Sequence, residues 1–222
     1  MSVLFLDAYG TILDTGDGSV RATAQILRSR GCDLDPVEVY ARWKSIHRHH
    51  LRTLEPFVVE AEVFRRDLAL LYGEIGIDGN PSEDVRPMLE TLGARRAYSD
   101  VRSALARLRR SYRIVVASNS DSGPLLADLA RNSIEVDGVF SSESLEAYKP
   151  APEFYHLLLE RTGVGADRAV FCGDSLEEDI GAPGRIGMQT VWMNRTHRTR
   201  SATDPVPDRE ICSLSELVTE ES

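Results

Sequence analysis

The segment Val3-Leu4-Phe5-Leu6-Asp7-Ala8-Tyr9-Gly10-Thr11 leads from a short apolar run directly into an acidic residue and a turn. The apolar run predicts a buried β-strand, and Asp7 stands where that strand ends. A buried strand has no structural need for a terminal carboxylate, whereas ligands of open α/β sheets bind at the carboxyl ends of the strands. Gly10 lets the backbone turn sharply and present amides and the Thr11 hydroxyl to an anion. We therefore interpret Asp7 as a nucleophile.

Length and composition restrict the class of protein. With 222 residues, 42% of them hydrophobic, the chain can bury a complete core and has room for a smaller inserted unit. Its 26 Lys and Arg residues against 35 Asp and Glu residues give a formal net charge of −9, which would repel nucleic acid over most of the surface. We expect a small-molecule substrate, no nucleic-acid partner, and a monomer or a homodimer.

The three cysteines, Cys32, Cys172 and Cys212, are far apart in the sequence and show no Cys-x-x-Cys spacing. This pattern argues against a disulfide framework and against a zinc site, and it fits a reducing cytoplasm. The chain shows no signal-like start, and no stretch approaches the roughly 18 apolar residues of a membrane span. We therefore expect a cytoplasmic protein without a membrane partner.

Strand-like apolar runs alternate with amphipathic helical segments over most of the chain. These runs cover residues 3–6, 114–117, 139–141, 170–172 and 190–193. The alternation predicts an α/β fold with a Rossmann-like parallel sheet and crossover helices.

One long stretch interrupts the alternation, because every periodic segment from about residue 15 to residue 96 predicts a helix. The expected helices span residues 20–30, 35–54, 56–75 and 82–92. Asp35 precedes Pro36, and Ser82 begins the last segment, so we expect both residues to cap helices. The prediction is a catalytic core of residues 1–14 and 97–222 with an all-helical cap of residues 15–96, termed the helical insert below.

Two further polar motifs follow strand-like runs and therefore belong at the same sheet edge as Asp7. The hydroxyl of Ser118 and the amide of Asn119 are suited to hold an oxyanion through neutral hydrogen bonds. Lys149, within Tyr148-Lys149-Pro150, is a cation that can keep Asp7 ionised and balance an anionic substrate.

The stretch Gly173-Asp174-Ser175-Leu176-Glu177-Glu178-Asp179 adds two carboxylates after another strand. Together with Asp7, the side chains of Asp174 and Asp179 would form an oxygen-rich site that suits Mg²⁺. With only Lys149 to offset them, the three carboxylates would repel one another, and a divalent cation relieves that repulsion. The sequence therefore predicts a metal site.

In their order and joint occurrence these four motifs resemble those of the haloacid dehalogenase-like (HAD) hydrolase superfamily, and the likeness spans nearly the whole chain. The resemblance implies that Asp7 attacks phosphorus or carbon, and that Ser118 and Lys149 bind the transferred group. It also implies that Asp174 and Asp179 hold magnesium, as in the phosphatase branch. The helical insert is similar to the cap of this family, which closes over small substrates and excludes water.

Tyr9 departs from the phosphatase pattern, in which a second Asp two residues after the nucleophile acts as acid and base. A tyrosine side chain with a pKa of about 10 cannot readily act as acid and base at neutral pH. The resemblance implies a different role for the backbone carbonyl of Tyr9, which would complete the metal shell. The first motif is instead similar to that of the L-2-haloacid dehalogenases, whose halide leaves without a proton. Arg42 lies about where those enzymes place the arginine that contacts halogen and substrate. Arg42 and Gly10 are therefore candidate substrate-binding residues, and Thr11 is a candidate for binding the phosphoryl group.

The segment His47-Arg48-His49-His50 raises the question of a second metal site, because residues three apart share a helix face. No carboxylate or cysteine lies at a matching spacing nearby in the sequence. A solvated or substrate-facing surface is therefore the favoured interpretation of this segment.

These observations predict a Mg²⁺-dependent hydrolase of the phosphatase type, acting on a small phosphorylated metabolite through a covalent intermediate on Asp7. Because Tyr9 replaces the second Asp, the leaving group must take its proton from solvent, from the substrate or from Tyr9, which is thus a further catalytic candidate. Aryl and acyl phosphates should therefore react faster than alkyl phosphates. Two alternatives stay open. One is a metal-independent 2-haloacid dehalogenase in which Arg42 steadies the leaving halide, and the other is a binding or regulatory protein that has lost turnover.

Overall fold

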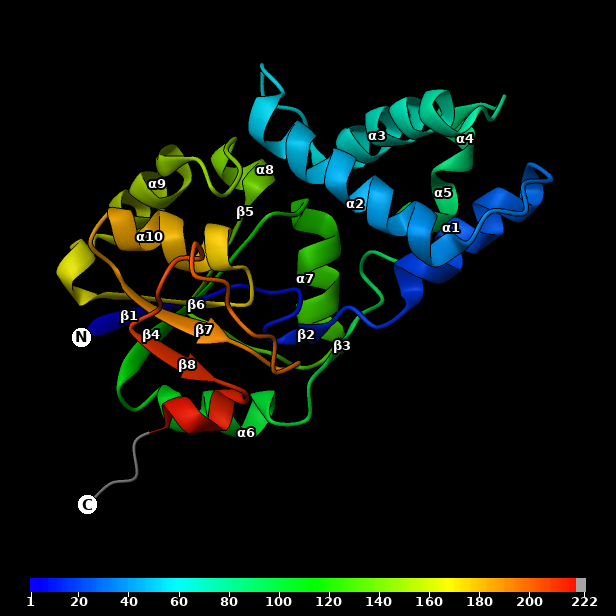
Figure 1. Ribbon diagram of the computed structural model, residues 1–222. Helices are drawn as coiled ribbons and strands as arrows, with labels where there is room; N and C mark the ends of the chain where they lie inside the picture. Colours follow the sequence, from blue (N-terminus) through cyan, green and yellow to red (C-terminus); the bar gives the residue numbers. More distant parts are fainter. Residues whose placement is uncertain (219–222) are drawn as a thin grey trace.

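The computed structural model describes residues 1–218 and has a six-stranded parallel sheet at its centre (Figure 1). The strand order is β5-β4-β1-β6-β7-β8. The strands are β1 (Ser2–Leu6), β4 (Tyr112–Ser118), β5 (Gly138–Ser141), β6 (Ala169–Gly173), β7 (Gln189–Met193) and β8 (Arg209–Ile211). The α/β class and the five predicted strands are confirmed. We did not predict β8, because its three residues include a single apolar side chain.

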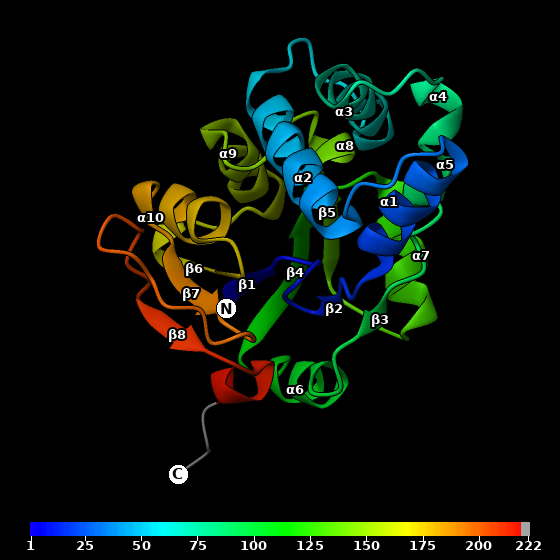
Figure 2. The same cartoon turned by 45° about the vertical axis from the view of Figure 1, so that its right-hand side comes forward.

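Alternate residues of β1 face opposite sides of the sheet, as the strand geometry requires. Leu4 and Leu6 join an apolar cluster that also contains residues of the helices α6 (Val101–Leu108) and α7 (Ser122–Arg131) and of the 3-10 turn η3 (Leu214–Leu217). Val3 and Phe5 join a second cluster with α9 (Pro152–Thr162) and α10 (Ala182–Arg185). Figure 2 shows these two groups of helices on either side of the sheet. The sheet is therefore buried on both faces, which explains the uninterrupted apolar runs.

The remaining short elements of the core connect its strands to its helices. They are α8 (Ser142–Leu145), η1 (Ala166–Arg168) and the π-helical turn η2 (Leu176–Gly181). No helix within residues 1–218 is both long enough and apolar enough to cross a membrane.

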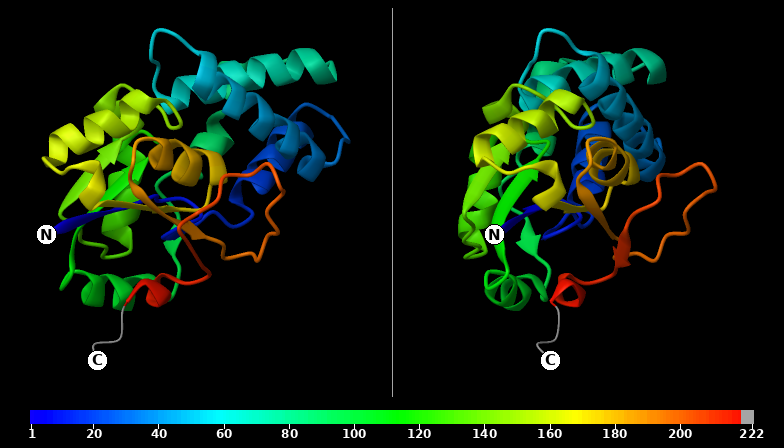
Figure 3. Two further views of the ribbon diagram at one scale, coloured as in Figure 1. Left: turned by 60° about the vertical axis from the view of Figure 1, so that its left-hand side comes forward. Right: turned by 90° about the vertical axis from the view of Figure 1, so that its left-hand side faces the viewer.

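Five helices occupy the helical insert and lie beyond one end of the sheet (Figure 3). They are α1 (Gly18–Ser29), α2 (Pro36–Thr53), α3 (Glu60–Ile75), α4 (Pro81–Asp84) and α5 (Arg86–Leu89). They enclose an apolar cluster of their own, in which Trp43 of α2 and Leu68 of α3 are buried. Asp35 caps α2 as predicted, since its side chain accepts a hydrogen bond from the Val37 amide at 2.8 Å.

Two helix predictions in the insert were wrong in their bounds. The helix expected from residue 56 begins only at Glu60, because Val59 is extended and the Val58 carbonyl accepts a hydrogen bond from Tyr148 of the core. The helix expected over residues 82–92 is split into α4 and α5, and Asn80 caps α4 in place of Ser82. Pro87 explains the split, since a proline supplies no amide to continue a helix.

A two-stranded antiparallel sheet of β2 (Leu13–Asp14) and β3 (Arg96–Ala97) joins the two ends of the insert. Leu13 pairs with Ala97 and Asp14 pairs with Arg96. This closure supports the division into a core of residues 1–14 and 97–222 and a cap of residues 15–96, which we retain as a proposal. Residues 219–222, which that division assigns to the core, lie outside the described part of the chain.

The strand order places the winding reversal of the sheet beside β1. From β1 the chain continues to β4 and β5 on one side, and it later returns to β6, β7 and β8 on the other. The loops that follow β1 and β6 therefore diverge, and the crevice between their carboxyl ends is where open α/β sheets bind ligands.

Candidate active site

Asp7 lies at this crevice. Its backbone amide donates a hydrogen bond to the Cys172 carbonyl of β6 at 2.9 Å, so the pairing of β1 with β6 extends through Asp7. The Thr11 hydroxyl donates to Oδ2 of Asp7 at 3.1 Å. The side chain of Asp7 is thus fixed from its own loop, which leaves little freedom in its direction.

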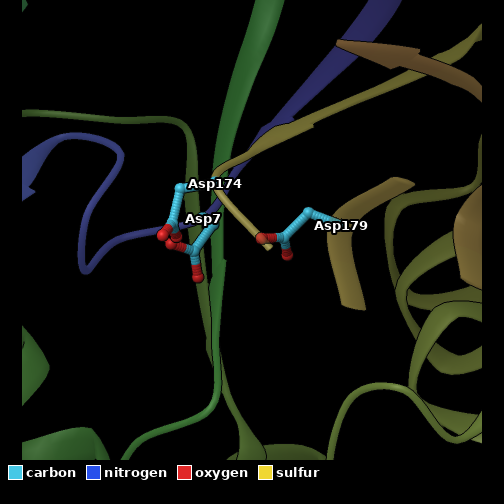
Figure 4. A group of neighbouring side chains, drawn as sticks. All are labelled: Asp7, Asp174 and Asp179. Carbon is cyan, nitrogen blue, oxygen red and sulfur yellow. The ribbon is translucent and has the colours of Figure 1, made fainter. Parts of the chain in front are cut away.

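Asp174 and Asp179 converge on Asp7 from the end of β6 and from η2 (Figure 4). One oxygen from each of the three carboxylates lies within 4.8 Å of the others. The Ser175 amide donates to Oδ2 of Asp179 at 2.9 Å and holds that carboxylate in the turn. The predicted convergence of the three acidic side chains is therefore present in the structure.

Two glycines permit this close approach. Gly10 has a φ of 91°, and a Cβ atom there would lie 2.8 Å from Cγ of Asp174. A Cβ atom on Gly173 would lie 2.3 Å from Cγ of Asp179. Any side chain at either position would displace a carboxylate, so Gly10 has a steric role here, while its predicted contact with substrate stays a prediction.

Lys149 lies between two of the acids and is almost fully buried. Its Nζ donates to Oδ1 of Asp7 at 2.8 Å and to Oδ1 of Asp179 at 2.7 Å. Asn119 holds the Lys149 backbone from both sides, because its amide nitrogen donates to the Lys149 carbonyl at 2.9 Å and its side-chain oxygen accepts from the Lys149 amide at 2.8 Å. Asn119 therefore positions the lysine, rather than offering its whole amide to an oxyanion as we expected.

Burial and like charges shift the pKa values of the acids in this cluster. Burial raises the pKa of Asp7 to about 6, although the Lys149 charge opposes this shift. Burial, followed by the charges of Asp7 and Asp179, raises the pKa of Asp174 to about 8. Burial would lower the pKa of Lys149, but the charges of Asp179 and Asp7 hold it well above its usual value. The cluster therefore has more negative charge than one ammonium group offsets, which favours an additional cation.

The donor set fits magnesium. Carboxylate oxygens are the hard ligands that this ion prefers, and it needs only one or two of them together with water and substrate oxygens. Asp7, Asp174 and Asp179 would hold it, and the resemblance adds the Tyr9 carbonyl as a further ligand. The group contains no sulfur or imidazole that would favour a softer metal.

The Tyr9 side chain is hydrogen-bonded to a helix of the core, whereas a catalytic role would require its hydroxyl to face the substrate. Its hydroxyl donates to Oδ2 of Asp128 in α7 at 3.1 Å. Burial, followed by the charge of Asp128, raises its pKa far above the ordinary value. The hydroxyl is thus engaged with α7 and is a poor proton donor at neutral pH, so this geometry does not support a catalytic role for the Tyr9 side chain.

Ser118 and Arg42 differ in how well they match their predicted positions. Ser118 is the last residue of β4 and is buried beside the loop that contains Asn119. Arg42 is exposed on α2, where its Nε and Nη2 each donate to Glu74 at 2.7 Å. The structure therefore does not bring Arg42 to the three acids, and its predicted contact with substrate has no support from this geometry.

The histidines of α2 have an acidic partner that sequence spacing did not indicate. Asp67 of α3 is fully buried, and its two oxygens lie 2.6 Å from Nδ1 of His47 and 2.6 Å from Nδ1 of His50. His47 and His50 are therefore only partly exposed and paired with an acid, which does not fit a solvated surface, while a substrate-facing surface stays a prediction. The carboxylate comes from the neighbouring helix, so no local spacing in the sequence could reveal it.

Three contacts fasten the insert to the loops of the site. Asp121, three residues after Ser118, accepts from the Glu60 amide at 2.7 Å and from the Ala61 amide at 3.0 Å. The Tyr148 hydroxyl, next to Lys149, donates to the Val58 carbonyl at 2.9 Å. Arg52 at the end of α2 forms an ion pair with Glu177 of η2. The insert therefore lies directly over the sheet edge that contains the acids.

Relatives of this chain occur among known families and curated proteins. Residues 1–187 match the model of the haloacid dehalogenase-like hydrolases. The chain belongs to this family. N-acylneuraminate-9-phosphatase of Mus musculus is 29% identical to this HAD hydrolase over 126 residues, which are 53% of this chain and 49% of the relative. The chain thus spans about half the length of the phosphatase relatives that it matches.

A dehalogenase matches over a greater length. Haloacetate dehalogenase H-2 of Moraxella sp. (strain B) is 28% identical over 224 residues, 98% of this chain and 96% of the relative. Among solved structures, an L-2-haloacid dehalogenase of Xanthobacter autotrophicus superposes with a TM-score of 0.80 at 20% identity, over 98% of this chain and 96% of the other. A HAD-hydrolase of Bacillus subtilis bound to magnesium gives 0.77 at 22% identity, over 97% and 96%. The two structures support the fold, and the relatives include both phosphatases and dehalogenases.

Proposed function

We propose that this HAD hydrolase is a Mg²⁺-dependent phosphatase of small phosphorylated metabolites with Asp7 as its nucleophile. The observation that supports this choice is the convergence of three carboxylate oxygens within 4.8 Å beside the buried Lys149. A 2-haloacid is itself a carboxylate, so Asp174 would repel it. A phosphate ester accompanied by a divalent cation turns the same acidic group into a binding site.

The reaction proceeds in two displacements. An oxygen of Asp7 attacks phosphorus as the bond to the ester oxygen breaks, which yields an aspartyl phosphate and an alkoxide or aryloxide that takes up a proton. Water then attacks phosphorus, phosphate leaves, and the Asp7 carboxylate is restored. Lys149, Ser118 and Thr11 would bind the phosphoryl oxygens, and Thr11 also orients the nucleophile. Bound magnesium would neutralise part of the charge on the phosphoryl group.

A dehalogenase is the second candidate, supported by the relative that matches over 98% of this chain. In that reaction Asp7 would displace halide from carbon, and water would hydrolyse the resulting ester. Tyr9 in place of an acid is compatible with it, because halide leaves without a proton.

The two functions differ in their need for metal. We expect phosphate release from p-nitrophenyl phosphate with Mg²⁺, its loss with EDTA, and no chloride release from 2-chloropropionate. Asp7→Asn should lower phosphatase activity by at least about 10³-fold, since the nucleophile is lost. Asp17→Asn is the matched control, because Asp17 is exposed and pairs with Arg21.

Chloride release that persists in EDTA would contradict the phosphatase and support the dehalogenase. Magnesium binding without hydrolysis across a broad panel of phosphorylated and halogenated acids would instead support a binding or regulatory protein.

A further inference from the structure

The proposed reaction needs a proton at the leaving oxygen, and the Tyr9 hydroxyl is bound to Asp128. Glu60, the first residue of α3, is a second acid near these loops and is only 8% exposed. Oε1 of its carboxylate lies 3.8 Å from Nε2 of His47, which is an ionic contact beyond hydrogen-bonding distance. An almost buried carboxyl group whose charge is balanced by a long contact to an imidazole is costly for folding, which suggests a role in chemistry.

The backbone around Glu60 is fixed to two of the catalytic loops. Asp121 follows Ser118 by three residues and binds the Glu60 and Ala61 amides at 2.7 Å and 3.0 Å. Asp121 precedes α7 but does not cap that helix, since its carboxylate binds the first amides of α3 instead. Two residues before Glu60, the Val58 carbonyl is bound to Tyr148, the neighbour of Lys149.

The charge of Glu60 also affects side chains of these loops. After burial, the charge of Glu60 is among the causes that raise the pKa values of Tyr9 and Tyr148. Tyr9 follows the nucleophile by two residues, and Tyr148 precedes the active-site lysine. The Glu60 backbone is thus bound to the loop that follows Ser118, and its carboxylate lies close enough to the Tyr9 and Tyr148 side chains to affect their pKa values.

His47 contacts Glu60, and Asp67 holds His47 in place. Asp67 binds Nδ1 of His47 at 2.6 Å, so this ring presents Nε2 toward Glu60. The other oxygen of Asp67 binds Nδ1 of His50, which fixes the carboxylate between two rings. Burial raises the pKa of Glu60 to about 7, while His47 and Arg95 lower it and Asp121 raises it. Glu60 can therefore exchange a proton near neutral pH.

We propose that Glu60 is the general acid and base of this site, that His47 and Asp67 are its positioning residues, and that the helical insert thus supplies the group missing at Tyr9. This role rests on the proposed phosphatase function. As the bond from phosphorus to the ester oxygen breaks, the carboxyl proton of Glu60 passes to that oxygen and the alcohol leaves. The Glu60 carboxylate then takes a proton from the water that attacks the aspartyl phosphate, and phosphate leaves Asp7. The second step restores both groups.

If Glu60 is the general acid, the effect of removing its carboxylate should depend on the leaving group of the ester. A purely structural role would not produce this dependence. p-Nitrophenolate leaves without a proton, whereas the alkoxide of ethyl phosphate requires one. In single-turnover measurements with saturating Mg²⁺, Glu60→Gln should slow formation of the aspartyl phosphate from ethyl phosphate by about 10²–10³-fold. Its formation from p-nitrophenyl phosphate should change by less than about 5-fold, and the phosphorylated protein should accumulate, detectable by intact mass.

Matched variants separate this role from damage to the fold. Glu62→Gln removes an exposed carboxylate from the same helical turn, where Glu62 pairs with Arg66, and should leave both esters within about twofold. His47→Gln should reproduce the leaving-group effect in weaker form, and Glu60→Asp should recover part of the ethyl phosphate rate.

The assignment is overturned if Glu60→Gln slows both esters equally, or if it slows neither and no phosphorylated protein accumulates. If Asp7→Asn is inactive in the same assays, such a result overturns only the role of Glu60. Failure of the unchanged enzyme to release phosphate from any ester overturns the proposed phosphatase and the role of Glu60 together.

Discussion

At the scale of single residues, Gly10 is one of the two glycines whose missing side chains let the three acids meet. Its φ of 91° and the 2.8 Å that would separate a Cβ atom there from Cγ of Asp174 both exclude larger residues. The residue thus sets the position of a carboxylate that belongs to a loop more than half the chain away in sequence. Its effect should be measurable in metal affinity and in rate.

Gly10→Ala should lower kcat/KM by about 10²-fold and raise the Mg²⁺ concentration for half-maximal activity, because Asp174 must move. Gly16→Ala is the control. Gly16 also has a positive φ, of 50°, but a Cβ atom there meets nothing within 4 Å, so this variant should stay within about twofold of the unchanged enzyme. Equal effects of the two substitutions would show that backbone strain, and not contact with Asp174, is responsible.

The residues of the site differ in how well their positions could be predicted from the sequence around them. Asp7, Lys149 and Asp174 could be brought together from the sequence, because parallel strands deliver the residues that follow them to one edge. The direction of the Tyr9 hydroxyl could not be predicted, since its partner Asp128 is 119 residues away. The surroundings of Glu60 could not be predicted for the same reason, because its neighbours come from three other segments of the chain.

At the scale of elements, α2 and α3 are joined by a buried carboxylate as well as by apolar packing. Asp67→Asn keeps the shape of the side chain but weakens its bonds to His47 and His50. We expect it to lower the free energy of unfolding by about 1–3 kcal/mol, measured by urea denaturation. Glu62→Gln, on the exposed side of α3, should change this free energy by less than about 0.5 kcal/mol. A change at Asp67 no larger than that of the control would mean that these bonds do not stabilise the helix pair.

The elements themselves were largely predictable. Long apolar runs marked the five main strands, and the helical periodicity of the insert was correct. Element ends were less accurate where tertiary contacts override local preference, as at residues 56–59, which are not helical and where Tyr148 binds the Val58 carbonyl. The short strands β2, β3 and β8 have too few residues to show a hydrophobic pattern, and only their pairing with other strands defines them.

At the scale of the whole molecule, buried acids make stability depend on pH. The folded-state pKa of Glu60 is about 7, above its unfolded value, so the folded state binds this proton more tightly and loses stability as pH rises from about 4.5 through 7. Burial lowers the pKa of His47, but the bond to Asp67 and nearby charges outweigh it and raise that pKa. The stability that His47 contributes is likewise present below about 6.5 and lost as pH rises through its folded value.

The free energy of unfolding should therefore fall between pH 5 and pH 8. In Glu60→Gln the fall should be smaller, by on the order of 1–3 kcal/mol, because the side chain no longer ionises. Urea denaturation of both proteins across this range provides the measurement. An identical pH profile for the two proteins would show that Glu60 titrates with an ordinary pKa.

The pairing of β2 with β3 has a consequence for how such a molecule can diversify. Because Asp14 and Arg96 are paired, the chain leaves the core and comes back to it at a single place. Everything between these residues can be lengthened, shortened or exchanged while the strands that deliver the acids keep their register. If Glu60 supplies the proton, however, such an exchange would alter the chemistry along with the choice of substrate, so in this protein the two would have to evolve together.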